Sequence, residues 1–286
     1  QIMKTIGFID YYLYEFHANA YPGWVKEICG ETGRSYAVAR AWAEKAVSPV
    51  DGKTNADWVA LTGVPVCDTF EEVCEKSDFL VILSPDNPEN HLRYAERALS
   101  YGKPTYIDKT FAPDLATAKK IFALSEKFGA PIFSTSALRC ADELSGMPTD
   151  AKSVIATGGG SSFDRYIVHQ LEMIVRLMGT DAKRVVALSE GENKILAVDY
   201  GNGRSAAINY SAELPFTVCV QRKENEKPVY LSIQSFYFKN LVREILRFFD
   251  TGVPYVSKKQ TLGLMAIRDA CLASQRNPYS FIDVEK

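Results

Sequence analysis

The sequence predicts an α/β fold with a doubly wound parallel sheet, followed by an α+β region with an open, mostly antiparallel sheet. In the first half, short apolar runs alternate with helical stretches of roughly 10–15 residues, a pattern typical of βαβ units. In the second half, several strand-like runs follow one another directly, and the turn Gly201-Asn202-Gly203 is a strong hairpin signal. A chain of 286 residues is long enough for both regions to form their own core.

The first half contains apolar, strand-like runs separated by helix start and stop signals. Thr69 and Glu72 form a capping box, and Asp114 caps a helix that ends before Gly129. Because strands and helices alternate, we expect a Rossmann-like dinucleotide-binding domain over residues 1–137. Its strands are expected at 4–9, 35–39, 64–66, 79–83, 105–107 and 131–134.

The second half predicts an α+β substrate and oligomerisation domain over residues 138–286. A glycine run, Gly158-Gly159-Gly160, precedes a helix at 164–178, and two further helices are expected at 236–251 and 258–274. The strands are expected at 151–157, 183–189, 194–200, 204–211, 216–222 and 229–234.

Composition excludes several classes of partner. The net charge of −2 leaves no basic excess for a phosphate backbone, so no nucleic acid is expected. No apolar run approaches the roughly 18 residues of a membrane span, so no membrane is expected. Six cysteines without a C-x-x-C pair predict reduced thiols in a cytoplasmic protein, and three scattered histidines predict no metal site.

The junction after the first strand lacks the glycines of a dinucleotide-binding loop. The three positions of G-x-G-x-x-G hold Asp10, Tyr12 and Glu15. A carboxylate about 5 Å from a phosphate costs on the order of 3 kcal/mol at an effective dielectric near 20. Tyr11 and Tyr12 either line a pocket at this loop or cover the edge of the sheet.

The second strand bears on the choice between NAD and NADP. The run that ends in Arg40 carries no Asp or Glu to hold a ribose 2′-hydroxyl. Arg40 would instead meet a 2′-phosphate and favour NADP. The alternative is that Arg40 is an ordinary surface charge.

Four segments in order resemble those of a known family, the Gfo/Idh/MocA oxidoreductases (glucose–fructose oxidoreductase, inositol dehydrogenase and relatives). They are VILSPDNPENH (81–91), GKPTYIDKT (102–110), GGGSSFDRYIVHQLEMIVRLMG (158–179) and FFDTGVP (248–254). The resemblance implies an NAD(P)-dependent enzyme that transfers a hydride between nicotinamide and a sugar, cyclitol or related polyol. It also implies a homo-oligomer, a dimer or tetramer, because one face of the open sheet needs cover.

The resemblance assigns roles to residues of the third segment and to one lysine. Lys109 matches the lysine near the nicotinamide and the reacting hydroxyl, and His169 matches the general acid/base. Asp164 matches the family's upstream aspartate approximately, since it precedes the histidine by five residues instead of four. Tyr166, His169 and Glu172 match the form Y-x-x-H-x-x-E found in a subgroup.

Further residues are expected at the two binding regions. Glu172 and Arg139 are expected to contact substrate, and the cofactor edge is expected to include Ser84, Pro85, His91 and Asp108. A histidine suits the proton transfer because its ordinary pKa lies near 7.

For each of these residues a purely structural role is the alternative, and a second function is the alternative for the protein. His169 is otherwise a half-buried helix histidine, Lys109 a solvated loop lysine and His91 a polar residue at a helix start. The alternative function is a family member that has lost dinucleotide binding and acts as a sugar-binding or regulatory protein, or as a non-redox sugar enzyme.

Overall fold

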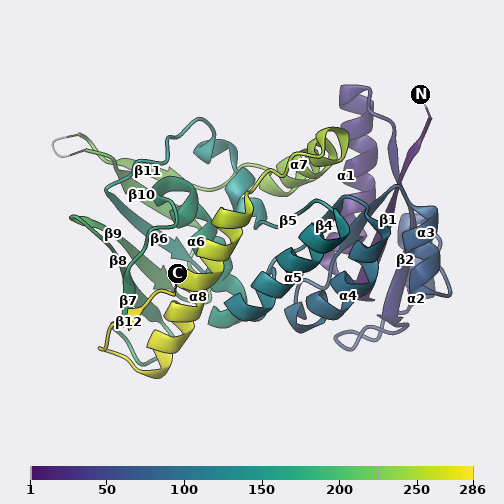
Figure 1. Ribbon diagram of the computed structural model, residues 1–286. Helices are drawn as coiled ribbons and strands as arrows, with labels where there is room; N and C mark the ends of the chain where they lie inside the picture. The colour runs from purple at the N-terminus through teal and green to yellow at the C-terminus, as the bar shows by residue number, and fades with distance from the viewer. Residues whose placement is uncertain (1, 224–225, 286) are drawn as a thin grey trace. The chain divides into compact units, whose positions relative to one another are not determined.

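The computed structural model describes residues 2–223 and 226–285 and forms two compact units (Figure 1). The first unit contains Gln1–Ser134 and Leu241–Val256, and the second contains Thr135–Asn240 and Ser257–Lys286. The first is built on a parallel sheet and the second on a mixed sheet. The predicted fold class, α/β followed by α+β, is confirmed.

The sheet of the first unit has five parallel strands in the order β2-β1-β3-β4-β5. The chain moves outward from β1 to β2 and then returns to the other side of β1 with β3, so the carboxyl ends of β1 and β3 flank a topological switch point. Ligands bind at such points in open α/β sheets. The strands are β1 (Lys4–Tyr12), β2 (Tyr36–Lys45), β3 (Phe79–Ile82), β4 (Thr105–Ile107) and β5 (Ile132–Phe133).

The helices of this unit begin where the sequence provides caps. Thr69 Oγ1 accepts a hydrogen bond from the Glu72 amide, and the Asp114 carboxylate accepts one from the Thr117 amide at 2.7 Å. Both predicted N-caps are therefore confirmed, but the capping box at Thr69 is not complete among the described residues, because the Glu72 carboxylate pairs with Lys76 at 2.7 Å. The helices are α1 (Phe16–Thr32), α2 (Asn55–Thr62), α3 (Phe70–Lys76), α4 (His91–Ala98) and α5 (Leu115–Phe128).

Two predicted strands differ from the structure. The second strand continues beyond residue 39 to Lys45 because β1, its partner, is nine residues long and pairs as far as Tyr12 with Lys45. The run 64–66 forms only an isolated bridge between Val66 and Ala41 and is not a sheet strand.

A late helix, α7 (Tyr237–Thr251), contributes its second half to the first unit. Phe248 is fully buried and lies edge-on to Phe133 with ring centroids 5.0 Å apart, while Phe249 stacks on Phe79 at 4.5 Å. The sequence-based division assigns all of 138–286 to the second domain. The structure differs because the aromatic face of α7 has its apolar partners on the parallel sheet.

The second unit has a seven-stranded sheet in the order β11-β10-β6-β9-β8-β7-β12, in which only β6 and β9 are parallel neighbours. The predicted turn Gly201-Asn202-Gly203 joins β8 to β9. Helices α6 (Phe163–Met178) and α8 (Lys258–Arg276) pack on one another, α6 lying against β6 and α8 against β7. The strands are β6 (Ser153–Gly158), β7 (Arg184–Ala187), β8 (Lys194–Gly201), β9 (Arg204–Tyr210), β10 (Thr217–Gln221), β11 (Val229–Ser232) and β12 (Ile282–Asp283).

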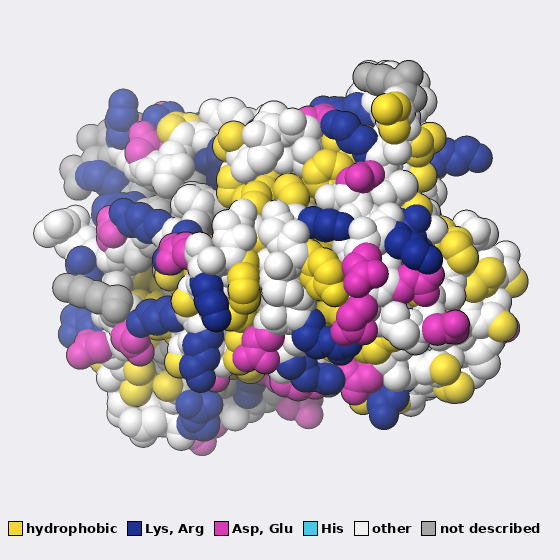
Figure 2. Space-filling model, turned by 45° about the vertical axis from the view of Figure 1, so that its right-hand side comes forward, with side chains coloured by type: hydrophobic (Ala, Val, Ile, Leu, Met, Phe, Trp, Pro, Cys, Tyr) yellow, Lys and Arg dark blue, Asp and Glu magenta, His cyan; other side chains and the backbone are white. Residues whose placement is uncertain are grey.

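The surface carries both signs of charge. On the face drawn in Figure 2, Lys and Arg side chains alternate with Asp and Glu side chains, in keeping with the net charge of −2. Over residues 2–223 and 226–285, every helix is too short or too polar to cross a membrane.

Truncation of Phe248 tests the assignment of α7 to the first unit. Phe248→Ala should lower the free energy of unfolding by about 3–5 kcal/mol, because it removes a buried ring from a packed aromatic cluster. Denaturant unfolding measures this loss. Phe236→Ala, at a side chain that is 55% exposed, should change stability by less than about 0.5 kcal/mol. Equal small effects would contradict the assignment.

Candidate functional site

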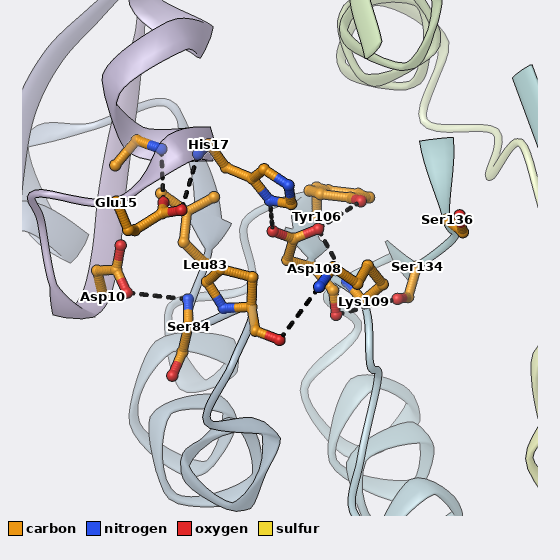
Figure 3. Close-up of polar contacts among 12 residues, drawn as sticks. Asp10, Glu15, His17, Leu83, Ser84, Tyr106, Asp108, Lys109, Ser134 and Ser136 are labelled. Carbon is orange, nitrogen blue, oxygen red and sulfur yellow. Dashed lines mark hydrogen bonds and ion pairs between the residues drawn. The ribbon is translucent and has the colours of Figure 1, made fainter. Parts of the chain in front are cut away.

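Polar and charged side chains gather where β1, β3 and β4 end (Figure 3). We call this group the strand-end cluster. Carboxyl ends of parallel strands are the edge at which α/β folds bind ligands. The cluster consists of Asp10, Glu15, His17, Ser84, Asp108 and Lys109.

Asp10 links the end of β1 to the end of β3. Its Oδ1 accepts hydrogen bonds from the Tyr11 amide at 2.7 Å and the Ser84 amide at 2.9 Å. Its Oδ2 is buried and has no hydrogen-bond partner among the described residues. Figure 3 shows the Asp10 carboxyl beside Glu15, so this oxygen belongs to a pair of acidic groups.

Glu15 caps the N-terminus of α1 with its own carboxylate. One oxygen accepts from the His17 amide at 2.7 Å, and the other accepts from the Ala18 amide at 2.5 Å. These amides and the helix dipole favour a negative charge, and they are the groups that bind phosphate in dinucleotide sites. The Glu15 carboxylate therefore lies where a bound anion is expected.

Asp10 and Glu15 repel one another in a buried setting. Burial is the main cause that raises the pKa of Glu15 to about 8, and the charge of Asp10 adds to it. Burial likewise raises the pKa of Asp10 well above its usual range. The pair consequently keeps one proton at neutral pH. The sequence predicts that both groups face a pyrophosphate, and the structure shows that they face each other.

His17 and Asp108 form a buried ion pair between α1 and the end of β4. Burial alone would raise the pKa of Asp108, but the neighbouring His17 brings it below its usual range. The pKa of His17 is raised: burial opposes the charge, and Asp108 outweighs burial. Asp108 also accepts from the Tyr106 hydroxyl at 3.1 Å and the Lys109 amide at 2.8 Å. Asp108 is thus a partner of groups within the protein, and its place in a cofactor site stays a prediction.

His17 is missing from the residues expected from sequence. It lies two positions after Glu15, in the first turn of α1, and stacks on Tyr21 with ring centroids 5.3 Å apart. The only signal in the sequence was its place just after the expected glycine loop, since Asp108 is 91 residues away.

Lys109 follows β4 directly, at the predicted strand end. Its side chain is largely buried, and its Nζ donates a hydrogen bond to the carbonyl of Pro85 at 3.4 Å. Lys109 thereby ties the segment after β4 to the loop after β3, which contains Ser84 and Pro85. Its position matches the prediction, and its role stays a proposal.

His91 uses both ring nitrogens within the protein. Nδ1 lies 3.0 Å from the carbonyl of Phe111 and Nε2 lies 2.5 Å from the carbonyl of Leu83, and burial lowers the pKa of the ring. A ring held in this way has no nitrogen left for a cofactor. These contacts favour the alternative, a residue that anchors the start of α4.

Arg40 lies in the middle of β2, so the prediction that the strand ends there is wrong. Its guanidinium donates to the carbonyl of Lys76 and to Ser77 Oγ, which ties it to the loop after α3. The carboxyl end of the strand instead carries Glu44 and Lys45. These contacts do not support a 2′-phosphate partner for Arg40.

Glu44 is the acidic residue that the sequence analysis missed. It stands one residue after Ala43, the register partner of Asp10, and so lies beside the end of β1. Its carboxylate accepts from the Tyr94 hydroxyl at 2.7 Å and pairs with Arg93. Burial is the largest single effect and raises its pKa, but the contacts with Tyr94 and Arg93 together outweigh burial and bring the pKa below its usual range. A carboxylate at this strand end suits a ribose hydroxyl. The signal was hidden because the strand boundary was placed too early.

The two tyrosines at the end of β1 differ in environment. Tyr12 is buried, and burial together with the charge of Asp86 raises its pKa to about 12. Tyr11 is half-buried and lies edge-on to Tyr12, with the ammonium of Lys45 6.0 Å from its ring centroid. Tyr12 therefore covers the sheet, whereas Tyr11 can still contact a ligand.

In the second unit, α6 presents His169 between two aromatic rings. Its Nδ1 lies 2.6 Å from Ser136 Oγ, and its ring centroid lies 5.4 Å from Tyr166 and 5.6 Å from Phe216. Gly160 makes room for this arrangement, since a Cβ there would lie 2.1 Å from the Tyr166 ring. The glycine run before α6 is therefore a steric requirement of the histidine's surroundings.

Glu172 and Arg139, both expected to contact substrate, form a buried ion pair with each other at 2.9 Å. The second oxygen of Glu172 accepts from Thr135 Oγ1 and from the Ser136 amide, both at 3.0 Å. Glu172 therefore fixes the backbone of the residue that contacts His169. The structure favours a positioning role for this pair over contact with substrate.

Asp164 lies on the exposed first turn of α6, where its charge complements the helix dipole. Its backbone carbonyl accepts from Arg268 at 2.9 Å. Among the described residues, the Asp164 carboxylate makes no hydrogen bond to His169, so the structure does not join these two predicted catalytic groups. Within the described ranges, no group of three or more His, Cys, Asp or Glu side chains is placed to hold a metal ion.

Comparison of the sequence with known proteins gives a short match. No family model matches the chain. It is 36% identical over 63 residues to the uncharacterized oxidoreductase YhhX of Escherichia coli (strain K12). That match covers 22% of this chain and 18% of YhhX.

Comparison of the structure gives matches over nearly the whole chain. A myo-inositol 2-dehydrogenase from Lactobacillus plantarum superposes with a TM-score of 0.78 at 13% identity, over 99% of this chain and 100% of that one. A probable dehydrogenase from Thermotoga maritima gives 0.78 at 12%, over 98% of each chain. GenD2 from gentamicin A biosynthesis, solved with NAD, gives 0.77 at 12%, over 99% of this chain and 97% of GenD2. The resemblance that the motifs indicate is thus confirmed for the fold.

The strand-end cluster predicts a pH dependence of stability. Between about pH 4.5 and 8, the folded protein keeps a proton on the pair of Asp10 and Glu15 that the unfolded chain has lost, so stability falls as pH rises. The slope for one proton is about 1.4 kcal/mol per pH unit. The raised pKa of His17 acts in the same direction above its ordinary value, because its stabilising charge is lost as pH rises. Thermal unfolding from about pH 5 to 8 measures the slope.

Glu15→Gln should make this slope shallower, because it removes one of the two coupled carboxyls. Glu213→Gln, at an exposed site in the second unit, should leave the slope unchanged. An unchanged slope in the Glu15 variant would show that the pair does not hold the retained proton.

Glu172→Ala tests the positioning network of the second unit. It leaves Arg139 buried without its counter-charge, a change that typically costs about 3–5 kcal/mol. We expect such a loss in denaturant unfolding, against less than about 0.5 kcal/mol for the exposed Glu213→Ala. A loss below about 1 kcal/mol would mean that the ion pair is solvated.

Proposed function

We propose that this protein is an NAD(P)-dependent oxidoreductase of the Gfo/Idh/MocA type that interconverts a hydroxyl and a carbonyl group on a sugar, cyclitol or related polyol. The observation that carries the proposal is the whole-chain fold match to dehydrogenases. It is supported by Lys109 at the carboxyl end of β4 and by His169 held in place on α6. The Lactobacillus plantarum neighbour is named for a cyclitol, myo-inositol, which supports the substrate class.

His169 is assigned the proton of the reacting hydroxyl. We assign His169 the tautomer in which Nδ1 donates to Ser136 Oγ, 2.6 Å away, because Nε2 then keeps the lone pair that a general base requires. Ser136 Oγ also accepts from the Leu138 amide at 3.3 Å, and this second contact fixes the hydroxyl. Glu172 and Arg139 act through Ser136 and are positioning residues.

Lys109 is assigned the orientation of the substrate hydroxyl. The hydrogen bond from its ammonium to the carbonyl of Pro85 holds a positive charge at the carboxyl edge of the parallel sheet. A cation beside a hydroxyl lowers the pKa of that hydroxyl and stabilises the developing alkoxide. A bound nicotinamide supplies the hydride acceptor, and the chain's own residues handle the proton.

A dinucleotide fits the residues at the end of β2, where its ribose is expected, better than the residues at the start of α1, where its pyrophosphate is expected. Glu44 at the end of β2 suits a ribose 2′-hydroxyl and supports NAD over NADP, and GenD2 was solved with NAD. The pyrophosphate does not fit the loop while Glu15 occupies the amides of α1. We therefore derive no step of the reaction from the phosphate groups.

The open face of the second sheet supports a homo-oligomer. By register, Tyr230, Cys219 and Ile155 lie side by side across β11, β10 and β6, and Tyr230 and Ile155 are 66% and 50% exposed. A row of exposed apolar side chains on a sheet face favours contact with another subunit. A dimer or tetramer, and a cytoplasmic location, remain proposals.

Turnover of a panel of polyols with NAD⁺ and NADP⁺, followed by the absorbance of reduced nicotinamide, tests the function. His169→Asn should lower kcat by about 100-fold or more and leave the cofactor Kd unchanged. Arg165→Ala, at an exposed site on the same helix, should retain full turnover. Loss of cofactor binding in the His169 variant would show that its role is misassigned. Absence of saturable binding of either cofactor to the wild type at millimolar concentration would remove the dehydrogenase and favour the alternative function.

A further inference from the structure

We propose that Glu15 is a built-in competitor of the cofactor pyrophosphate, and that a dinucleotide binds only when Glu15 leaves the α1 amides as the neutral acid. The inference rests on the proposed function and adds the residue that sets the affinity and the pH dependence of cofactor binding. It starts from the place of one carboxylate on the helix.

The Glu15 carboxyl group occupies the N-terminal amides of α1. The two Glu15 oxygens accept from two successive amides, of His17 and Ala18, as two oxygens of a phosphate group would. The helix has 17 residues, so its dipole is fully developed at this end. Two anions cannot share the same amides, so a phosphate and the Glu15 carboxylate exclude each other.

One carboxyl oxygen of Asp10 is buried beside Glu15 and accepts no hydrogen bond from the described residues. Asp10 is 1% exposed, its Oδ1 is held by two backbone amides, and its Oδ2 lacks a partner among the described residues. This oxygen lies on the side of Glu15 (Figure 3). A neutral Glu15 can donate its proton to this oxygen, because the two carboxyl groups already lie side by side and interact. The structure thus contains an acceptor for the displaced side chain.

The other charged groups near Glu15 have partners of opposite charge. The ring of His17 is paired with Asp108, and Lys109 stands beside Asp108 at the end of β4. The acidic pair and the His17 ring both change charge with pH at the α1 terminus, and the Glu15→Gln variant removes the contribution of the pair alone. The titratable groups that face the pair from the neighbouring elements are Tyr12, His17, Asp108 and Lys109.

The device gives a defined pH dependence. Below about pH 8 the acidic pair already holds the proton that Glu15 needs to leave as the neutral acid. Above this value the pair must take up a proton when the dinucleotide binds, so affinity falls by about tenfold per pH unit. Above this pH, release of the dinucleotide returns the proton to solvent, so no net proton is gained or lost over one cycle of binding and release.

The experiment measures the Kd of NADH and of inorganic pyrophosphate by calorimetry for the wild type and for Glu15→Gln. The variant should bind both ligands at least about tenfold more tightly, because a ligand no longer has to displace the Glu15 carboxyl group from the α1 amides. Its affinity should no longer fall above about pH 8. Glu27→Gln, at an exposed site on the same helix, should match the wild type.

A second variant is needed because a glutamine at position 15 can still accept hydrogen bonds from the α1 amides. Glu15→Gly removes the side chain and leaves a residue that is tolerated at an N-cap, and it should bind pyrophosphate at least as tightly as Glu15→Gln. If neither variant binds pyrophosphate or NADH more tightly than the wild type, the inference is overturned. The same holds if the wild type shows no loss of affinity above about pH 8.

The failure of this inference is distinct from failure of the proposed function. Pyrophosphate carries no nicotinamide, so tighter binding of pyrophosphate without any polyol turnover would support the competition and remove the dehydrogenase. Polyol turnover by the wild type with equal cofactor affinities in all variants would support the dehydrogenase and remove the competition.

Discussion

The first unit depends on how charge is buried at the carboxyl ends of β1, β3 and β4. Asp10 joins two of these strand ends through backbone amides, and the ion pair of His17 with Asp108 joins α1 to the third. Buried ions are tolerated only when partners satisfy them. The partners here come from α1 and from the ends of three different strands. The order of these loops therefore depends on the protonation of the acidic groups. Glu15 is the member of this group whose charge the helix amides stabilise and Asp10 opposes.

The second unit solves a similar problem by pairing. Glu172 satisfies Arg139 on one oxygen and the backbone of Ser136 on the other, so a buried ion pair becomes a fixed support for His169. The histidine itself is only half-buried, and its orientation comes from Ser136 and the flanking rings. In the function proposed above, the residue assigned to proton transfer is thus separate from the residues that hold it in place. The separation explains why residues suspected of contacting substrate are found facing each other.

Much of the fold could be predicted from sequence because it rests on local signals. The caps at Thr69 and Asp114 and the turn at 201–203 depend on residues close in the chain. The place of α7 could not be predicted, because Phe248 meets Phe133 across a long separation in sequence. The same reason hid the partners of Arg40, Glu172 and His17, whose contacts lie 33 or more residues away. Glu44 was missed because the length of β2 is set by its pairing with β1.

The dehydrogenases with the same fold are only 12–13% identical to this chain, so the fold does not depend on the particular residues at the strand ends. The order of strands brings β1 and β3 together at a switch point whatever residues follow them. The chemistry of that point depends on the first turn of α1, where glycine exposes amides to a ligand and Glu15 covers them. Architecture and phosphate affinity are therefore set by different residues. A chain can keep the whole fold, with 99% of its length superposed on GenD2, and still cover the amides of its first helix with a carboxyl group of its own.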